Sequence, residues 1–192
     1  TPDVLIPRPE TELLVVALLD RARQVEGGRD QLSIIDVGTG SGVLAICAAR
    51  QLPKSRVTAV DVSPAALAVA RRNVTRHGLD ERVSLVQSDL FSELPVEARF
   101  DFIVSNPPDV TTAELETLEP TVRDFEPRLA LDGGRDGTAV IERILAEAPH
   151  RLRVDGMLLM EISPTIIDRV ESLISQSRLV PQPTIPDLEG HP

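Results

Sequence analysis

The sequence predicts an α/β fold, a doubly wound and mainly parallel sheet with helices on both faces. Two observations carry this prediction: short apolar segments alternate with capped helical segments, and the first apolar segment runs directly into a cluster of glycines. Strands separated by helices form parallel sheets through right-handed crossovers, which place helices on both faces. With 192 residues and no internal repeat, residues 1–192 are expected to form a single domain.

Five short segments rich in aliphatic residues are expected to form the strands. They are Ser33–Val37, Val57–Val60, Val83–Gln87, Phe102–Ser105 and Met157–Ile162. Apolar segments of this length, bounded by turn residues, are typical of buried strands in a parallel sheet. The final stretch from Leu179 contains three prolines and is expected to add at most one short strand.

Helices are expected where apolar residues recur at helical spacing and capping residues mark the ends. They are Glu12–Arg23 (ended by Gly27-Gly28), Gly42–Gln51, Pro64–His77, Thr138–Leu152 and a segment that follows Pro164. Ser63 and Ser163 each precede a proline, a pattern that supplies an N-cap and a first-turn residue. The polar segment Thr111–Arg128 is expected to be a loop with some helix.

Composition excludes several classes of protein. Hydrophobic residues make up 42% of the chain, too many for a disordered protein, and no apolar run approaches the roughly 20 residues of a membrane helix. The net charge of −10 and the presence of only four aromatic residues disfavour nucleic acid as a direct substrate. Cys47 is the single cysteine, which excludes an intrachain disulfide and a thiolate metal cluster and favours a cytoplasmic location.

The loop after the first predicted strand is the first candidate binding site. It contains Gly38, Thr39, Gly40, Ser41 and Gly42. Alternating glycines let a backbone pass close to a ligand, and doubly wound sheets bind ligands at the carboxyl ends of their strands. We therefore expect these five residues to bind a cofactor. A dinucleotide fingerprint has Gly-x-Gly-x-x-Gly, and Val43 in the sixth place disfavours NAD.

Two acidic residues follow the next two strands. Asp61 closes the second strand about 20 residues after the glycines, where a carboxylate can accept hydrogen bonds from both ribose hydroxyls. The alternative interpretation is a helix-cap acid beside Ser63. Asp89 follows the third strand, where it can accept from an exocyclic adenine amine, or can simply be a solvated loop acid.

The segment after the fourth strand carries the most specific signal. It reads Ser105-Asn106-Pro107-Pro108-Asp109. The Asn106 side chain offers an acceptor, and prolines stiffen the chain and remove backbone N–H groups, which leaves carbonyls as unopposed acceptors. A rigid pair of acceptors suits a planar NH₂ group that must be held in one orientation. The alternative is a loop that merely ends a strand.

Four motifs together resemble the peptide-chain release factor glutamine N5-methyltransferase family. They are Ile6–Glu12, Asp36–Gly42, Asn106–Pro108 and Glu126–Gly134, and the resemblance extends over essentially the whole chain. It implies a Rossmann-like class I methyltransferase that uses S-adenosylmethionine and no metal. The Gly38–Gly42 loop, Asp61, Asp89, Leu90 and Asn106 would surround the cofactor. Asn106 and Pro107 would act in catalysis by gripping the glutamine amide of the Gly-Gly-Gln motif in a release factor.

This chain departs from the family pattern at several places. Pro108 and Asp109 would line the substrate site, but Asp109 replaces the tyrosine of Asn-Pro-Pro-Tyr, so the aromatic contact of that tyrosine to the substrate amide is missing. We therefore expect weak activity and a gain in the variant Asp109→Tyr. Leu90 stands where relatives often have an aromatic residue. The family normally also carries an N-terminal helical domain, which is absent from this chain, since Thr1 stands immediately after where that domain would end. Asp187–Gly190 resembles a family segment that precedes a last strand, and the chain stops at Pro192.

The residues favour direct in-line methyl transfer, because no carboxylate or histidine base is evident in the sequence and orientation is the main requirement. An adenine-N6 or related base methyltransferase is the alternative, since its nucleophile is also a planar NH₂ group. A third possibility is a domain that binds cofactor and partner with little activity because of Asp109. The predicted partner is a release factor, and no association with a membrane is expected.

Overall fold

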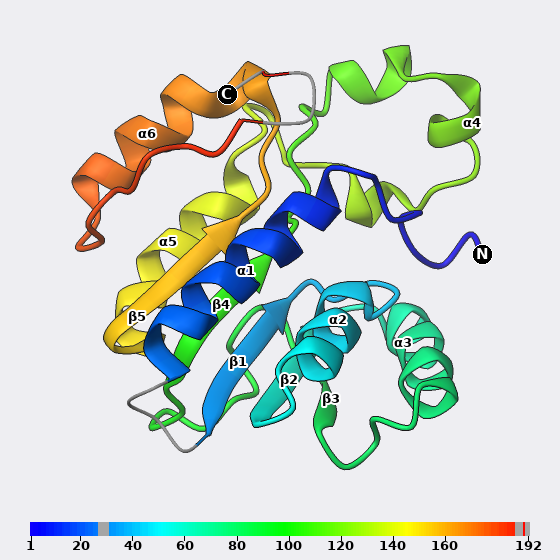
Figure 1. Ribbon diagram of the computed structural model, residues 1–192. Helices are drawn as coiled ribbons and strands as arrows, with labels where there is room; N and C mark the ends of the chain where they lie inside the picture. The colour runs from blue at the N-terminus through cyan, green and yellow to red at the C-terminus, as the bar shows by residue number, and fades with distance from the viewer. Residues whose placement is uncertain (27–30, 187–189, 191–192) are drawn as a thin grey trace.

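The structure is a computed structural model that describes residues 1–26, 31–186 and 190 (Figure 1). Gly27-Gly28 and most of Asp187–Gly190, for which the sequence suggested a helix end and a family segment, lie outside the described residues. The strands are β1 (Leu32–Val37), β2 (Ser55–Asp61), β3 (Val83–Gln87), β4 (Phe100–Ser105) and β5 (Leu152–Met160). The α-helices are α1 (Thr11–Glu26), α2 (Val43–Gln51), α3 (Pro64–Arg76), α4 (Pro120–Arg123), α5 (Ala139–Arg151) and α6 (Ile167–Gln176).

The sheet confirms the predicted fold class. Its strand order is β3-β2-β1-β4-β5, and neighbouring strands in the described residues all pair in parallel. The order reverses between β1 and β4, whose following loops therefore diverge at the centre of the sheet. This reversal is where open α/β sheets bind their ligands.

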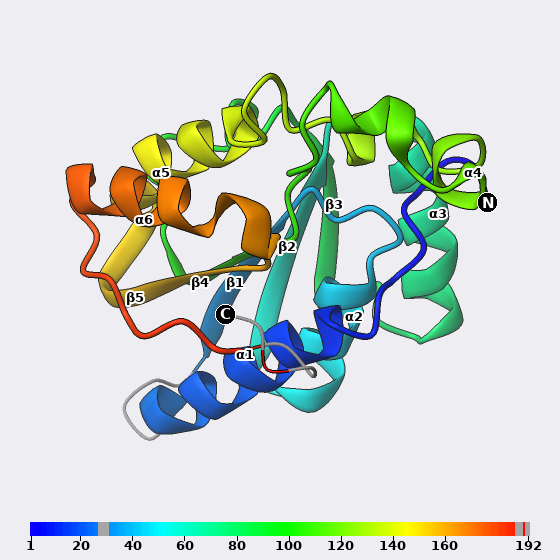
Figure 2. The same cartoon turned by 90° about the horizontal axis from the view of Figure 1, so that it is seen from above.

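Helices cover both faces of the sheet, as Figure 2 shows from above. On one face, α1, α2 and α3 pack through Leu18, Ala45 and Val74 against Ile34 of β1 and other strand residues. On the other face, α5 packs with the segment after β3, and α6 packs on α5. Adjacent strand residues enter opposite cores, which explains why the strands read as continuous apolar runs rather than alternating ones.

The predicted bounds of β5 are wrong. The strand begins at Leu152, five residues before the predicted Met157, and ends at Met160. Phe100 of β4 pairs with Leu152 and Phe102 pairs with Met157, so β5 carries extra residues between the two pairs. Asp155 has a φ of 62° within this irregularity. The apolar pattern marks only the regular half of the strand, because exposed residues fill the irregular half.

The less regular segments agree with the sequence. Between Thr111 and Arg128 the chain forms short 3₁₀ turns and the four-residue α4. No strand follows α6 within residues 177–186. In Figure 1 the segment that carries α4 lies beyond the carboxyl ends of the strands, near the N-terminus of the chain. Among the residues that the structure describes, no helix is long and apolar enough to cross a membrane.

Candidate active site

The glycine loop turns sharply between β1 and α2. Gly38, Gly40 and Gly42 have φ angles of 73°, 54° and 83°, which residues other than glycine rarely adopt. A Cβ on Gly38 or Gly40 would meet no atom within 4 Å, so that face of the loop is open. A Cβ on Gly42 would approach Ala70 of α3 to 3.3 Å, which shows that the third glycine serves helix packing.

A buried carboxylate supports the loop from below. Asp36 Oδ2 accepts from the Thr39 hydroxyl at 2.6 Å and from the Ala45 backbone N–H at 3.1 Å. Oδ1 is buried and has no hydrogen-bond partner among the described residues. Burial raises the pKa of Asp36 to about 6, although the two hydrogen bonds oppose the rise and the charge of Asp61 adds to it. Asp36 therefore fixes the loop and the start of α2.

Asp61 bridges the glycine loop and the start of α3. Its Oδ2 accepts from the Gly40 backbone N–H and its Oδ1 from the Ser63 backbone N–H, both at 2.9 Å. The Ser63 hydroxyl in turn accepts from Ala66 N and caps α3. The carboxylate is thus held between the glycine loop and the start of α3. Each oxygen keeps a further lone pair for a ligand hydroxyl.

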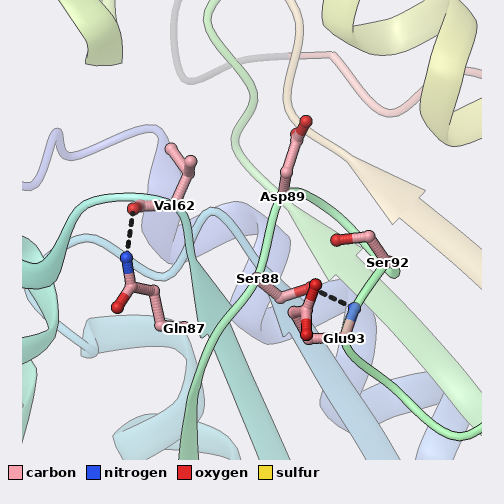
Figure 3. A pocket seen from close by; sticks show the side chains of 6 residues that line it. All are labelled: Val62, Gln87, Ser88, Asp89, Ser92 and Glu93. Atoms are coloured by element: carbon pink, nitrogen blue, oxygen red, sulfur yellow. Dashed lines mark hydrogen bonds between the residues drawn. The ribbon is translucent and has the colours of Figure 1, made fainter.

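A pocket of about 350 Å³ lies beside this carboxylate (Figure 3). Its walls come from the ends of β2 and β3 and the segment that follows β3: Val62, Gln87, Ser88, Asp89, Ser92 and Glu93. Asp61 pairs with Gln87 in the sheet, so the pocket begins one residue beyond Asp61. Gln87 Nε2 donates to the Val62 carbonyl at 3.4 Å across it.

Of the two predicted residues after β3, one lines the pocket and one does not. Asp89 is exposed at its rim, where Arg143 of α5 donates to Oδ2 at 2.8 Å. Leu90, at a φ of 53°, turns into the core beside Phe91 and is absent from the pocket wall. Leu90 therefore shapes the turn that places Asp89 rather than forming the wall itself.

These features fit a nucleoside cofactor without phosphates. The open face of the glycine loop gives backbone access, and Asp61 presents acceptors for hydroxyl groups. Asp89 and Glu93 give the pocket acidic walls, which suit an amine-bearing or cationic ligand better than a pyrophosphate. The described residues contain no group of three or more His, Cys, Asp or Glu that could hold a metal ion.

Asn106 lies one residue beyond the end of β4, next to the glycine loop. The preceding Ser105 is buried, and its hydroxyl donates to the Val37 carbonyl at 2.7 Å, which ties the two loops together. Asn106 is half-buried, and its Nδ2 donates to Thr11 Oγ1 at 3.3 Å. Pro107 is buried and Pro108 half-buried. The structure therefore brings the predicted amide-gripping residues and the glycine loop to one edge of the sheet.

Sequence reasoning missed Glu161, which follows β5. Its pKa is raised by burial, and hydrogen bonds from the side chains of Thr11 and Asn106 oppose the rise. Nothing local distinguishes Glu161 from a solvated loop acid. Only its position opposite β4 in the sheet could have revealed it.

Asp109 turns toward the chain that follows β5. Its Oδ2 accepts from the Ser163 backbone N–H at 2.5 Å. Burial raises the pKa of this carboxyl, while the hydrogen bond from Ser163 opposes the rise. The backbone of Asp109 is packed against Gly133 and Gly137, where a Cβ would come within 2.8 and 2.6 Å of it. Asp109 thus braces the loop that follows β4.

An ion pair joins two of the motifs to which the sequence assigned no role. Arg8 Nη2 donates to both carboxylate oxygens of Glu126, at 2.9 and 2.8 Å. Only 2% of the Glu126 side chain is exposed, against 37% for Arg8. The pair holds the N-terminal segment against the segment around α4. Arg8 lies only three residues before Thr11. It therefore helps to place Thr11 beside Asn106.

Comparison with known proteins defines the class. The family model described as methyltransferase small domain matches residues 10–133. The fold is similar to that of the ribosomal protein L11 methylase from Lactobacillus delbrueckii subsp. bulgaricus, with a TM-score of 0.63 and 20% identity over 88% of this chain and 69% of that one. The hMettl16 catalytic domain, solved in complex with MAT2A 3′UTR hairpin 6, is also similar in fold, with a TM-score of 0.67 and 19% identity. The match covers 95% of this chain and 66% of that one. Fold and site are those of a methyltransferase domain.

Curated relatives narrow this class to one family. The protein named release factor glutamine methyltransferase from Rhodopirellula baltica is 44% identical to this chain, over 98% of this chain and 64% of the relative. The protein of that name from Gloeobacter violaceus is 45% identical, over 86% of this chain and 58% of the relative. The protein of that name from Bordetella pertussis is 41% identical over 99% and 68%. The chain belongs to the release factor glutamine methyltransferase family. It spans 58–68% of the length of these three relatives.

Proposed function

We propose that this chain methylates the side-chain amide nitrogen of a glutamine in a peptide chain release factor, within its Gly-Gly-Gln motif. The observation that carries the proposal is the placement of Asn106 and Pro107 beside the glycine loop, at the centre of the sheet edge. The names and 41–45% identity of the relatives support the choice of substrate. The cytoplasm is the proposed location, since the proposed substrate acts in protein synthesis.

The cofactor that we propose is S-adenosylmethionine, which when bound supplies an electrophilic methyl group. The open face of Gly38–Gly42 would hold its amino-acid part, Asp61 its ribose and the pocket with Asp89 its adenine. This assignment is supported by the positive φ angles of the glycines, the fixed carboxylate and the acidic pocket walls.

The substrate amide would be held by two acceptors, the Asn106 Oδ1 and the Pro107 carbonyl. Both would accept hydrogen bonds from the amide NH₂ group, and such bonds strengthen as the nitrogen gains positive charge in the transition state. Alignment of the reacting groups can contribute about 7–11 kcal/mol, so this chain needs no covalent intermediate. Pro108 and Asp109 complete the loop behind these acceptors.

Two variants separate the two halves of the site. Asn106→Ala is expected to abolish methyl transfer and to leave cofactor affinity nearly unchanged, because Asn106 mainly faces the nucleophile. Asp61→Ala is expected to weaken cofactor binding by about 1.5–3 kcal/mol, the range for hydrogen bonds to a charged group. Calorimetric titration of S-adenosylmethionine and a methyl-transfer assay measure the two effects. Equal loss of cofactor binding in both variants would contradict the assignment of Asp61 to the cofactor and Asn106 to the substrate amide.

The substrate is tested with release factor, release factor in which the glutamine is replaced by alanine, and RNA. Radiolabelled methyl transfer to the first alone supports the proposal. Transfer to RNA would instead identify a base methyltransferase, and cofactor binding without transfer to any substrate would identify a binding domain.

A further inference from the structure

Asn106 and Glu161 are neighbours because of the register between β4 and β5. Ser105 pairs with Met160 in the parallel ladder, and the Glu161 backbone N–H donates to the Ser105 carbonyl at 3.1 Å. The two residues therefore leave the sheet side by side. Glu161 is placed by the sheet itself rather than by a flexible loop.

A third side chain closes a small cluster around the Asn106 amide. Asn106 Nδ2 donates to Thr11 Oγ1 at 3.3 Å, and Thr11 is only 5% exposed. The side chains of Thr11 and Asn106 stabilise the charged form of the Glu161 carboxyl, since both lower its pKa. Its Oε2 is buried and has no hydrogen-bond partner within the part of the chain that the structure describes.

An ionised carboxylate can only accept hydrogen bonds, whereas an asparagine side chain can present either its carbonyl or its NH₂ group. Glu161 therefore selects one of the two orientations of the Asn106 amide, the one with NH₂ toward the cluster. The flipped orientation would set Oδ1 against a carboxylate, leaving two acceptors without a proton between them.

We propose that Glu161, acting with Thr11, is a positioning residue that holds the Asn106 Oδ1 toward the substrate nitrogen. The inference rests on the proposed function, because it takes Asn106 Oδ1 as the acceptor of the glutamine amide. Glu161 acts through Asn106 and Thr11 and is assigned no contact with the reacting atoms.

Protonation of Glu161 removes this selection. A neutral carboxyl group offers one donor and one acceptor, so it accommodates either orientation of the Asn106 amide. Burial raises the pKa of Glu161, and the nearby carboxyl groups of Asp109 and Glu10 raise it further. The turnover of the protein is therefore expected to fall as the pH drops through the raised pKa of Glu161.

The variant Glu161→Gln tests the inference in steady-state kinetics with release factor. At neutral pH its kcat is expected to fall about tenfold, the size expected for one hydrogen bond, with KM and cofactor affinity unchanged. In Glu161→Gln, kcat no longer falls at low pH through protonation of residue 161. In Asp109→Asn, this fall of kcat at low pH remains. Thr11→Val lowers kcat and Thr11→Ser restores it. The matched control Glu97→Gln removes an exposed charge ahead of β4, at the opposite end of the strand, and leaves kcat unchanged.

A second readout does not depend on activity. The side-chain NH₂ resonances of ¹⁵N-labelled Asn106, assigned by their loss in Asn106→Ala, are expected to titrate with Glu161 in the wild type and not in Glu161→Gln. Wild-type kcat in Glu161→Gln, or Asn106 resonances that do not follow Glu161, overturns the inference. Failure of the wild type to methylate any glutamine, with the NH₂ titration intact, would instead count against the proposed function.

Discussion

Asp36 shows how a single residue can support a binding loop at a cost to stability. Its carboxyl group is fully buried, with a pKa of about 6 against 3.8 for an ordinary aspartate. The folded protein therefore binds the proton more tightly than the unfolded chain does. Stability from this group is present below pH 3.8 and is lost as the pH rises through about 6.

The variant Asp36→Asn is expected to remove this pH dependence. Relative to the wild type, its free energy of unfolding should rise between pH 4 and pH 7 by on the order of 3 kcal/mol, the equivalent of the pKa difference. Urea denaturation at a series of pH values measures the difference. Asp3→Asn, at an exposed position, is the control. Parallel curves for Asp36→Asn and the wild type would show that Asp36 does not titrate in this range.

At the scale of elements, the loop after β4 is braced by its neighbours. The Asp109 side chain accepts from Ser163, and its backbone lies against Gly133 and Gly137. The Val110 N–H also donates to the Leu131 carbonyl at 3.0 Å. The loop that carries Asn106 is therefore held from two sides, by the segment after β5 and by the glycine turn before α5.

Asp109→Tyr is expected to change turnover and stability in opposite directions. A tyrosine ring would press the substrate amide into plane, and we expect a rise in kcat of about tenfold, or ~1.4 kcal/mol in the barrier. The Ser163 N–H would lose its acceptor, which costs about 1 kcal/mol. Kinetics at saturating release factor and thermal unfolding measure the two effects. Asp109→Asn keeps an acceptor and is expected to show neither. Unchanged kcat in Asp109→Tyr would make the aromatic wall dispensable.

At the scale of the whole molecule, the Arg8–Glu126 pair joins segments 118 residues apart. Arg8→Ala leaves a buried carboxylate without its partner and is expected to cost about 2 kcal/mol. Arg123→Ala breaks an ion pair with Asp124 in which both side chains are exposed, and it is expected to leave stability almost unchanged. Denaturant unfolding compares the two variants. Similar losses would mean that the Arg8–Glu126 pair is also screened by solvent.

Local patterns were sufficient to predict the fold class and most elements. The glycine loop, the Ser63 cap and the apolar strands are signals within a few residues, and the structure confirms each of them. The start of β5 depends on its pairing with β4, so no local pattern contains it. Glu161 and Thr11 were missed for the same reason, because only the sheet register and a long-range ion pair bring them to Asn106.

The candidate site draws its residues from chain positions 11 to 161. Thr11 precedes the sheet, Gly40 follows the central strand β1, Asp61 ends β2, and Glu161 follows β5. Contacts between residues that lie so far apart along the chain are slow to form, because the intervening chain must close into a loop first. A chain leaving the ribosome therefore carries an incomplete site until β5 has emerged and paired with β4. Under the proposed function, the order of synthesis alone would withhold activity from nascent chains.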